Sequence, residues 1–479
     1  MTTPAQVAKN SLLLFSSHLV AKIFLVLSSI LLANYLGVQL FGTYSFAFAL
    51  AALFAPLCDL GADAYLTREL AREQSADPRR IAAILSLKAA LALITFLLIV
   101  AALQLFGYTE PTSTIVYLAA SIMISRVYIN TSFAVFRAFQ RIKYESAVIV
   151  LQRALEFLVV LLVIALGLSI LQLLLLILIS LGASGVVSFT LLKKKFLPHP
   201  LQWRQSDIPA MLRGGLPFAL TAIFVTIYFQ IDSVMLSIMV GDESVGAYRS
   251  AYNLIFGLFI FSAAIVTTLY PFIARYHQTD RKLAVSVGQR AVRYSLMVGI
   301  PIALGCSLFS SEIMDLLYSD EYLNASITLS IIIWVLPMMY VTNILGHVLG
   351  AIQLQRMVVF VSIVNALFNV VLNLVLIPLY GQDGAALATV ATEFLGLIIL
   401  SIVVWSRFGR FVEFAVTGRI LAASALLVPL YLFRDSLHFL AILPLAIFAY
   451  LSAAILLKLF SVVQVKNLFT QMIQHVREP

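Results

Sequence analysis

The sequence predicts an all-α protein that crosses a membrane many times. Its 479 residues are 62% hydrophobic and only 11% charged, whereas a soluble domain typically carries about 25% charged residues. The hydrophobic residues form continuous runs of about 20 residues, the length that crosses a bilayer as a helix, and do not alternate as in a transmembrane β-barrel. Soluble multidomain enzymes, disordered chains and coiled coils are therefore excluded.

Short polar breaks divide these runs into fourteen predicted spans, within the roughly 15 that the apolar residues could supply. Twelve or thirteen spans remain the alternative, because the break at Gly167 is short and the last pair is weakly separated. Residues 11–35 are interpreted as a retained first helix, since the run is too long for a signal peptide. The predicted spans are centred near Leu25, Ala52, Leu93, Met123, Phe157, Leu175, Thr226, Phe261, Met297, Ile332, Asn369, Val390, Leu426 and Ile447.

The distribution of basic residues predicts that both chain ends are cytoplasmic. Of the 31 Lys and Arg residues, 25 fall in segments on one side of this topology and only Arg434 falls on the other, where acidic residues dominate. Cytoplasmic loops carry such an excess of Lys and Arg. The net charge of +9 therefore indicates the orientation of the chain in its membrane, with no nucleic-acid partner.

The connections leave no room for an extramembrane catalytic domain. The longest predicted outer loop, residues 311–324, has an ordinary length, and the largest inner one, residues 193–213, contains Pro198, Pro200 and Pro209 and reads as a linker. No Gly-rich phosphate loop and no metal-ligand cluster is found in the sequence. The chain is therefore predicted not to be an enzyme and to need no cofactor.

An internal repeat indicates duplication. Residues 36–44 (Leu-Gly-Val-Gln-Leu-Phe-Gly-Thr-Tyr) and 240–248 (Val-Gly-Asp-Glu-Ser-Val-Gly-Ala-Tyr) share the spacing of two Gly and one Tyr at an offset of 204 residues. A second, shorter repeat pairs Ala138-Phe139-Gln140 with Ala351-Ile352-Gln353. Six spans separate the first pair, so the two halves would have parallel topology, a common transporter design.

Three stretches resemble the multidrug/oligosaccharidyl-lipid/polysaccharide exporter superfamily, specifically its polysaccharide flippase branch. They are residues 36–44 with Asp59-Leu60-Gly61, residues 232–248, and residues 369–389 with their Asn, Ile-Pro, Gly and Gly-Ala-Ala sequence. The resemblance implies two pseudo-symmetric six-helix lobes, residues 1–195 and 214–406, around a central cavity. Residues 196–213 would form a cytoplasmic linker, and residues 407–479 the last two spans and a cytoplasmic tail.

The same resemblance implies a function in the cell's inner (plasma) membrane. A polyprenyl-diphosphate-linked oligosaccharide would be moved from the cytoplasmic to the outer leaflet by alternating access, for O-antigen, capsule or exopolysaccharide synthesis. The expected partners are this substrate, membrane lipids, a polysaccharide polymerase and a chain-length regulator, with the protein itself a monomer. The alternatives are a lipid II flippase, a drug or cation antiporter of the same superfamily, and, more distantly, a membrane glycan polymerase or ligase.

Basic side chains inside spans are the candidate substrate-binding groups, because buried charges are costly and usually functional. A lipid diphosphate is anionic, so cations would offset its charge in a medium of low dielectric constant. The cationic cavity is predicted to comprise Lys22, Arg126, Arg153, Arg249 and His18. An antiporter for organic cations would need an acidic or aromatic cavity instead.

Acidic groups inside spans are candidates for H⁺ or Na⁺ coupling or for ion pairing: Asp59, Asp63, Asp232 and Glu393. Arg153 and Glu156 are expected to pair, being three residues apart on one helix. Asp59 and Asp63 could pair with Lys88 or Arg126, and Arg249 could pair with Asp232.

Two further predictions concern side chains near the ends and faces of spans. Lys88 could extend to the interface. Asn365, Asn369 and Asn373 form a polar stripe that is expected to bond neighbouring helices.

Overall fold

The computed structural model describes residues 4–197, 208–434 and 436–459, and in these residues it contains helices and no strand. Eleven of the helices are long and apolar enough to cross a membrane. The all-α, multi-pass prediction is confirmed. Most of the predicted linker and the predicted tail from residue 460 lie outside the described residues.

Two of the long helices each contain two predicted spans. α1 (Pro4–Asp59) and α14 (Gln355–Arg407) are interrupted by Gly37 (φ 73°) and Gly381 (φ 56°), whose backbone angles are not helical. Only glycine adopts such angles without steric cost. The predicted span around Phe261 is divided between α8 (Asp242–Leu258) and α9 (Ile260–Tyr276). These divisions reconcile eleven long helices with fourteen predicted spans.

The chain forms two compact units. Unit 1 comprises residues 1–260, 317–328 and 362–389, and unit 2 comprises residues 261–316, 329–361 and 390–479. Large apolar side chains remain exposed on their helices, for example Leu93 (62%) and Leu97 (57%) on α3. Such faces are stable only where lipid covers them, which agrees with a membrane protein.

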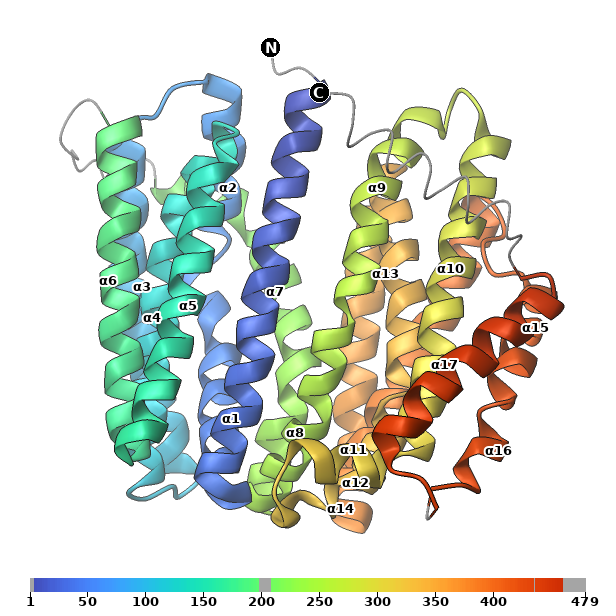
Figure 1. The fold of residues 1–479 in the computed structure, drawn as a ribbon. Helices are drawn as coiled ribbons and strands as arrows, with labels where there is room; N and C mark the ends of the chain where they lie inside the picture. The colour runs from blue at the N-terminus through green and yellow to red at the C-terminus, as the bar shows by residue number, and fades with distance from the viewer. Residues whose placement is uncertain (1–3, 198–207, 435, 460–479) are drawn as a thin grey trace. The chain divides into compact units, whose positions relative to one another are not determined.

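In unit 1, α1 is the central element. It packs against α4, α5, α7 and α8, and α4 and α5 pack in turn against α6 (Figure 1). Two helices of this unit begin at capping side chains: Asp77 caps the start of α3, and Ser169 and Gln172 form a capping box before α6. Further helices of this unit are α2 (Ala62–Glu73), α3 (Pro78–Leu105), α4 (Thr112–Ala138), α5 (Ile142–Leu166), α6 (Ile170–Phe196) and α7 (Ile208–Met239).

The turn of α1 at Gly37 is covered by residues 317–322, which include the 3₁₀ helix η2 (Asp320–Tyr322). Asn34 donates to the Leu317 carbonyl and accepts from the Ser319 N–H, both at 2.8 Å. The Glu321 carboxylate accepts from the Val38 N–H at 2.9 Å. These hydrogen bonds hold together the end of unit 1 that is predicted to face outward.

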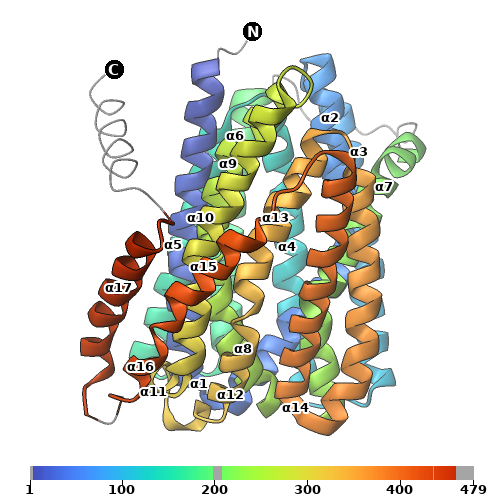
Figure 2. The same ribbon diagram turned by 90° about the vertical axis from the view of Figure 1, so that its right-hand side faces the viewer.

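Unit 2 is built on α9, α10 (Arg281–Leu308) and α13 (Val335–Ala351), to which α15 (Phe414–Ala425) and α17 (Phe439–Leu456) are added. Tyr450 of α17 donates to the Met297 carbonyl of α10 at 2.6 Å. α15 packs on both α10 and α17. Figure 2 shows α15 and α17 on its left side. The short elements are α11 (Ser310–Leu317), α12 (Ala325–Ile332) and α16 (Val428–Tyr431).

Candidate functional site

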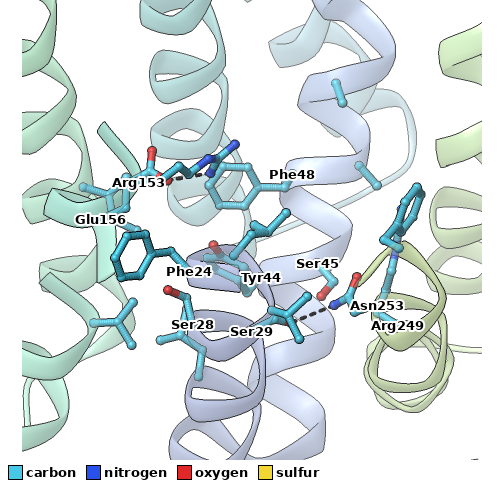
Figure 3. Close-up of a pocket in the computed structure, with 18 of the residues that line it drawn as sticks. Phe24, Ser28, Ser29, Tyr44, Ser45, Phe48, Arg153, Glu156, Arg249 and Asn253 are labelled. Carbon is cyan, nitrogen blue, oxygen red and sulfur yellow. Dashed lines mark hydrogen bonds and ion pairs between the residues drawn. The ribbon is translucent and has the colours of Figure 1, made fainter. Parts of the chain in front are cut away.

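Unit 1 encloses a cavity of about 370 Å³ whose wall carries Lys22, Arg126, Arg153 and Arg249, with one carboxylate, Glu156. We call it the cationic cavity. Its wall is formed by side chains of α1, α4, α5, α7 and α8 together with Ile177 of α6. Figure 3 shows Arg153 and Glu156 on one side, Arg249 and Asn253 on the other, and α1 between them.

Four of the five predicted binding residues therefore come together. The fifth, His18, is exposed on α1 and does not line the cavity. Phe24 and Phe48 supply aromatic surface in the wall, and Ser28, Ser29 and Ser45 supply small polar groups. The mixture offers cations for an anion and rings and hydroxyls for a polar, stackable ligand.

Glu156 joins two of the cations. Its Oε1 accepts from Arg126 at 2.9 Å, and its Oε2 accepts from Arg153 at 2.6 Å. Gln152 donates to the same Oε1 at 3.3 Å. The predicted Arg153–Glu156 pair is thus confirmed. The link to Arg126 was not expected, because 30 residues separate it from Glu156 in sequence.

The other two cations have neutral partners. Lys22 donates to the Phe256 carbonyl at 3.3 Å and lies 5.2 Å from the centre of the Phe259 ring. Arg249 donates to Ser233 at 2.6 Å and also to the Gln230 side chain. Among the described residues, neither forms an ion pair within 4.0 Å. The cavity wall therefore holds four positive charges and one negative charge.

The Arg249–Asp232 pair, one of two alternatives considered for these residues, is absent from the described structure. Asp232 is 2% exposed and accepts instead from Tyr248 (2.8 Å), Thr389 (3.0 Å) and Asn373 (2.6 Å). Three neutral donors thus satisfy the carboxylate, while Arg249 meets polar groups of its own. Tyr248 and Thr389 were not identified as its partners because each lies on another helix, 16 and 157 residues away in sequence.

The asparagine stripe bonds a neighbouring helix, as predicted, at one of its three positions, Asn373. Asn373 bonds Asp232 on another helix and also Asn369 of its own helix, the latter at 3.0 Å. The Oδ1 of Asn365 is buried without a hydrogen-bond partner among the described residues. None of the three lines the cationic cavity.

A second cavity of about 660 Å³ adjoins the first. The two share Ala52, Met123, Gln230 and Phe256 in their walls. The second continues along unit 1 to Asp59, Asp63 and, near the end of α4, Arg137, which belong to the end predicted to be cytoplasmic. The two cavities together form one compartment that extends from the cation cluster toward that end.

Asp59 and Asp63 form a closed ionic group with Lys88. The Lys88 ammonium lies 2.8 Å from Asp59 and 2.7 Å from Asp63, and it donates to Thr131 at 2.8 Å. Lys88 is completely buried. The interpretation that it extends to the interface is wrong, because two carboxylates and a hydroxyl converge on it inside the bundle.

Glu393, the fourth predicted acidic residue, lies in unit 2. It is 5% exposed and accepts from Thr342 of α13 at 3.4 Å. It therefore has a partner on a neighbouring helix, which its position in the sequence did not suggest.

Comparisons with known sequences give the family. The family model described as "Polysaccharide biosynthesis protein" matches residues 7–277, and the model named MatE matches residues 217–375. The probable low-salt glycan biosynthesis flippase Agl15 of Haloferax volcanii is 28% identical over 163 residues, 34% of either chain. The probable flippase AglR of the same organism is 24% identical over 36% of this chain and 37% of its own. The chain thus aligns with about a third of the length of these relatives.

Comparisons with solved structures support the fold. The lipid II flippase MurJ in an inward closed conformation superposes with a TM-score of 0.78 at 19% identity, over 93% of this chain and 98% of its own. The multidrug transporter DinF-BH gives 0.63 at 17% identity, over 86% and 97%. In a further comparison of sequences alone, a membrane protein of Methanocaldococcus jannaschii is 23% identical over 80% of this chain and 94% of its own. With more than half of the sequence matched by its model, the chain belongs to the polysaccharide biosynthesis protein family.

Proposed function

We propose that this protein is a flippase that moves a polyprenyl-diphosphate-linked oligosaccharide from the cytoplasmic to the outer leaflet of the inner membrane, for cell-surface polysaccharide synthesis. The observation that carries the proposal is the cationic cavity, with four cations and a single carboxylate in its wall. The family membership and the relatives named as flippases support it.

The cavity is suited to the diphosphate of such a lipid, which is the part that is most costly to move through a bilayer. Moving a phosphate charge into hydrocarbon costs far more than moving a neutral polar group, unless the charge is paired. Lys22 and Arg249, which have neutral partners, and the Arg126–Arg153 pair would offset the charge of a diphosphate. The sugars would lie against polar and aromatic groups of the wall, and the polyprenyl chain would remain in lipid.

The position of the compartment in unit 1 supports the proposed direction of transport. In unit 1 the compartment leads toward Asp59, Asp63 and Arg137, whereas residues 317–322 cover the turn of α1 at the opposite end. We propose that the cargo enters from the predicted cytoplasmic end. The lobes 1–195 and 214–406 would then part at the outer end to release it.

Ion coupling belongs to the same proposal. Asp59 and Asp63 line the second cavity. Asp232 lines neither of the two cavities and is satisfied by three neutral donors. We therefore propose Asp59 and Asp63 as the groups at which a coupling H⁺ or Na⁺ would act. The expected polymerase and chain-length regulator partners also remain proposals.

A lipid II flippase is the second candidate, because lipid II presents the same diphosphate to the same cations and the fold of MurJ is similar. An antiporter for organic cations is disfavoured, since the cavity's excess positive charge would repel its cargo. Flipping assays with two cargoes, a lipid-linked oligosaccharide repeat unit and lipid II, separate the first two candidates.

The experiment is reconstitution into proteoliposomes with a fluorescent lipid-linked oligosaccharide in the inner leaflet. We expect the Lys22→Ala, Arg126→Ala double variant to lose flipping while its yield and thermal stability stay near those of wild type. The matched control is Lys194→Ala, Arg290→Ala, which removes one exposed Lys and one exposed Arg outside the cavity. Normal flipping by the cavity variant would overturn the proposal.

A further inference from the structure

We infer that Glu156 is a built-in counter-anion: in the empty cavity it occupies Arg126 and Arg153, and the phosphate of the cargo competes with it for them. Glu156 would then set how tightly the cavity holds an anion and how readily it releases it. This inference rests on the proposed function, since it needs an anionic cargo in the cationic cavity.

The geometry places one carboxylate between two guanidinium groups from different helices. Arg153 is on the same helix as Glu156, three residues away, so their 2.6 Å pair is local. Arg126 comes from α4, and its 2.9 Å contact is the one that depends on tertiary packing. Each guanidinium offers five N–H donors, of which the carboxylate uses a small part. The Nε of Arg126 is buried and has no hydrogen-bond partner among the described residues.

A second ion pair between the same helices differs in that its carboxylate is fully buried. Arg137 of α4 pairs with Glu145 of α5, and the Glu145 side chain is 0% exposed and lines neither cavity. Glu156 retains 10% exposure, its partners Arg126 and Arg153 retain 24% and 26%, and all three line the cationic cavity. An incoming anion can therefore reach all three groups of the Glu156 cluster, whereas of the Glu145 pair it can reach only Arg137, which is 51% exposed and lines the second cavity.

The chemistry of the exchange follows from the charges. A phosphate oxygen and a carboxylate oxygen make the same charge-assisted hydrogen bonds to a guanidinium, so the two anions compete for the same donors and repel each other. Glu156 therefore lowers the affinity for the cargo. Four uncompensated cations would bind a diphosphate more tightly and release it more slowly, which is a disadvantage for a transporter that must let its cargo go.

The test uses the full-length protein in nanodiscs and inorganic pyrophosphate as the probe, titrated by calorimetry. Glu156→Gln keeps the shape of the side chain and removes its charge, so we expect its Kd to fall about tenfold and its flipping rate in proteoliposomes to fall as well. The control, Glu413→Gln, removes the carboxylate of the Arg293 pair, which lines neither cavity, and should leave the Kd unchanged. Farnesyl diphosphate as a second probe should show the same ratio of Kd values, since the effect acts on the headgroup.

A second variant tests the inference in the opposite direction. Gln152 already donates to Glu156, so Gln152→Glu would add a second carboxylate beside the two arginines and should weaken pyrophosphate binding about tenfold. If Glu156→Gln fails to fold, Gln152→Glu decides alone, and an unchanged Kd overturns the inference. So does a folded Glu156→Gln variant that binds pyrophosphate no more tightly than wild type. If wild type itself binds no pyrophosphate, the proposed function fails instead.

Discussion

Gly42 and Asp242 lie so close together that a Cβ atom on Gly42 would be 1.7 Å from the carbonyl oxygen of Asp242. The reciprocal contact is present as well, since a Cβ on Gly246 would be 2.1 Å from the carbonyl oxygen of Val38. Both glycines and both carbonyls are related by the same offset of 204 residues. The two copies of the repeated motif therefore pack against each other as a pseudo-symmetric pair, and Thr43 adds a 2.6 Å hydrogen bond to Asp242.

The first prediction is that Gly246→Ala destabilises the protein. The atom that the new methyl group would meet is backbone, which moves less easily than a side chain, so we expect a cost of about 1–3 kcal/mol, typical of overpacking. The measurement is thermal unfolding of the purified protein in detergent. Gly182→Ala is the control, because nothing lies within 4 Å of its Cβ position and alanine favours a helix over glycine. Equal melting temperatures for the two variants would contradict the prediction.

The contact between the two repeated motifs also shows which features local sequence patterns can predict. Hydrophobic runs predict the spans because the bilayer imposes a length on them, and the shared Gly and Tyr spacing predicts that the chain is duplicated. Neither signal says that the two motifs touch. Contact between residues 204 positions apart depends on how whole helices pack, which local patterns do not encode.

The contacts of the candidate site likewise include some that the sequence predicts and some that it does not. The Arg153–Glu156 pair is predictable because three residues on one helix share a face, whereas the bond from Arg126 joins two helices and is not. Lys88 was misinterpreted because its place near the end of a span suggests an interfacial side chain. The structure surrounds it with Asp59, Asp63 and Thr131. The cavity itself appears only when four helices bring their cations together.

The second prediction concerns Lys88. Lys88→Met removes the one cation between two carboxylates, and loss of one partner of a buried ion pair typically costs about 3–5 kcal/mol. We expect a large drop in melting temperature and a lower yield of folded protein. Adding Asp63→Asn to this variant should restore part of the loss, because one of the two stranded charges is then removed. A Lys88→Met protein as stable as wild type would show that the ionic group carries no net stability.

The third prediction concerns Asp232. Asp232→Leu would remove the acceptor that Tyr248, Thr389 and Asn373 share. Other partners remain, namely the Ala385 carbonyl for Thr389 and Asn369 for Asn373. We therefore expect a total cost of about 1–3 kcal/mol, that of one buried group left unsatisfied. Asp232→Asn should cost much less, because its carbonyl oxygen still accepts and the hydroxyls of Tyr248 and Thr389 can reorient. Thermal unfolding of the two variants side by side measures the difference. An Asn variant that is as unstable as the Leu variant would argue that the negative charge, and not the hydrogen bonding, matters at this position.

The fourth prediction ranks the cations of the cavity. Lys22 and Arg249 are not paired with a carboxylate in the described structure, so their charge acts in full on an incoming anion, whereas Arg126 and Arg153 share Glu156. Lys22→Gln and Arg249→Gln should therefore weaken pyrophosphate binding more than Arg153→Gln does. Loss of a hydrogen bond to a charged group is worth about 1.5–3 kcal/mol, or about 10- to 100-fold in Kd.

Calorimetric titration of each variant at one ionic strength measures this ranking, because partly buried charges are still screened to some degree by salt. Arg293→Gln is the control, since Arg293 pairs with Glu413 and lines neither of the two cavities, and its Kd should change least. If Arg153→Gln weakened binding as strongly as Lys22→Gln, Glu156 would not be offsetting the charge of its arginine partners. In that case its role as a counter-anion would have to be abandoned, even though the cavity would still bind the anion.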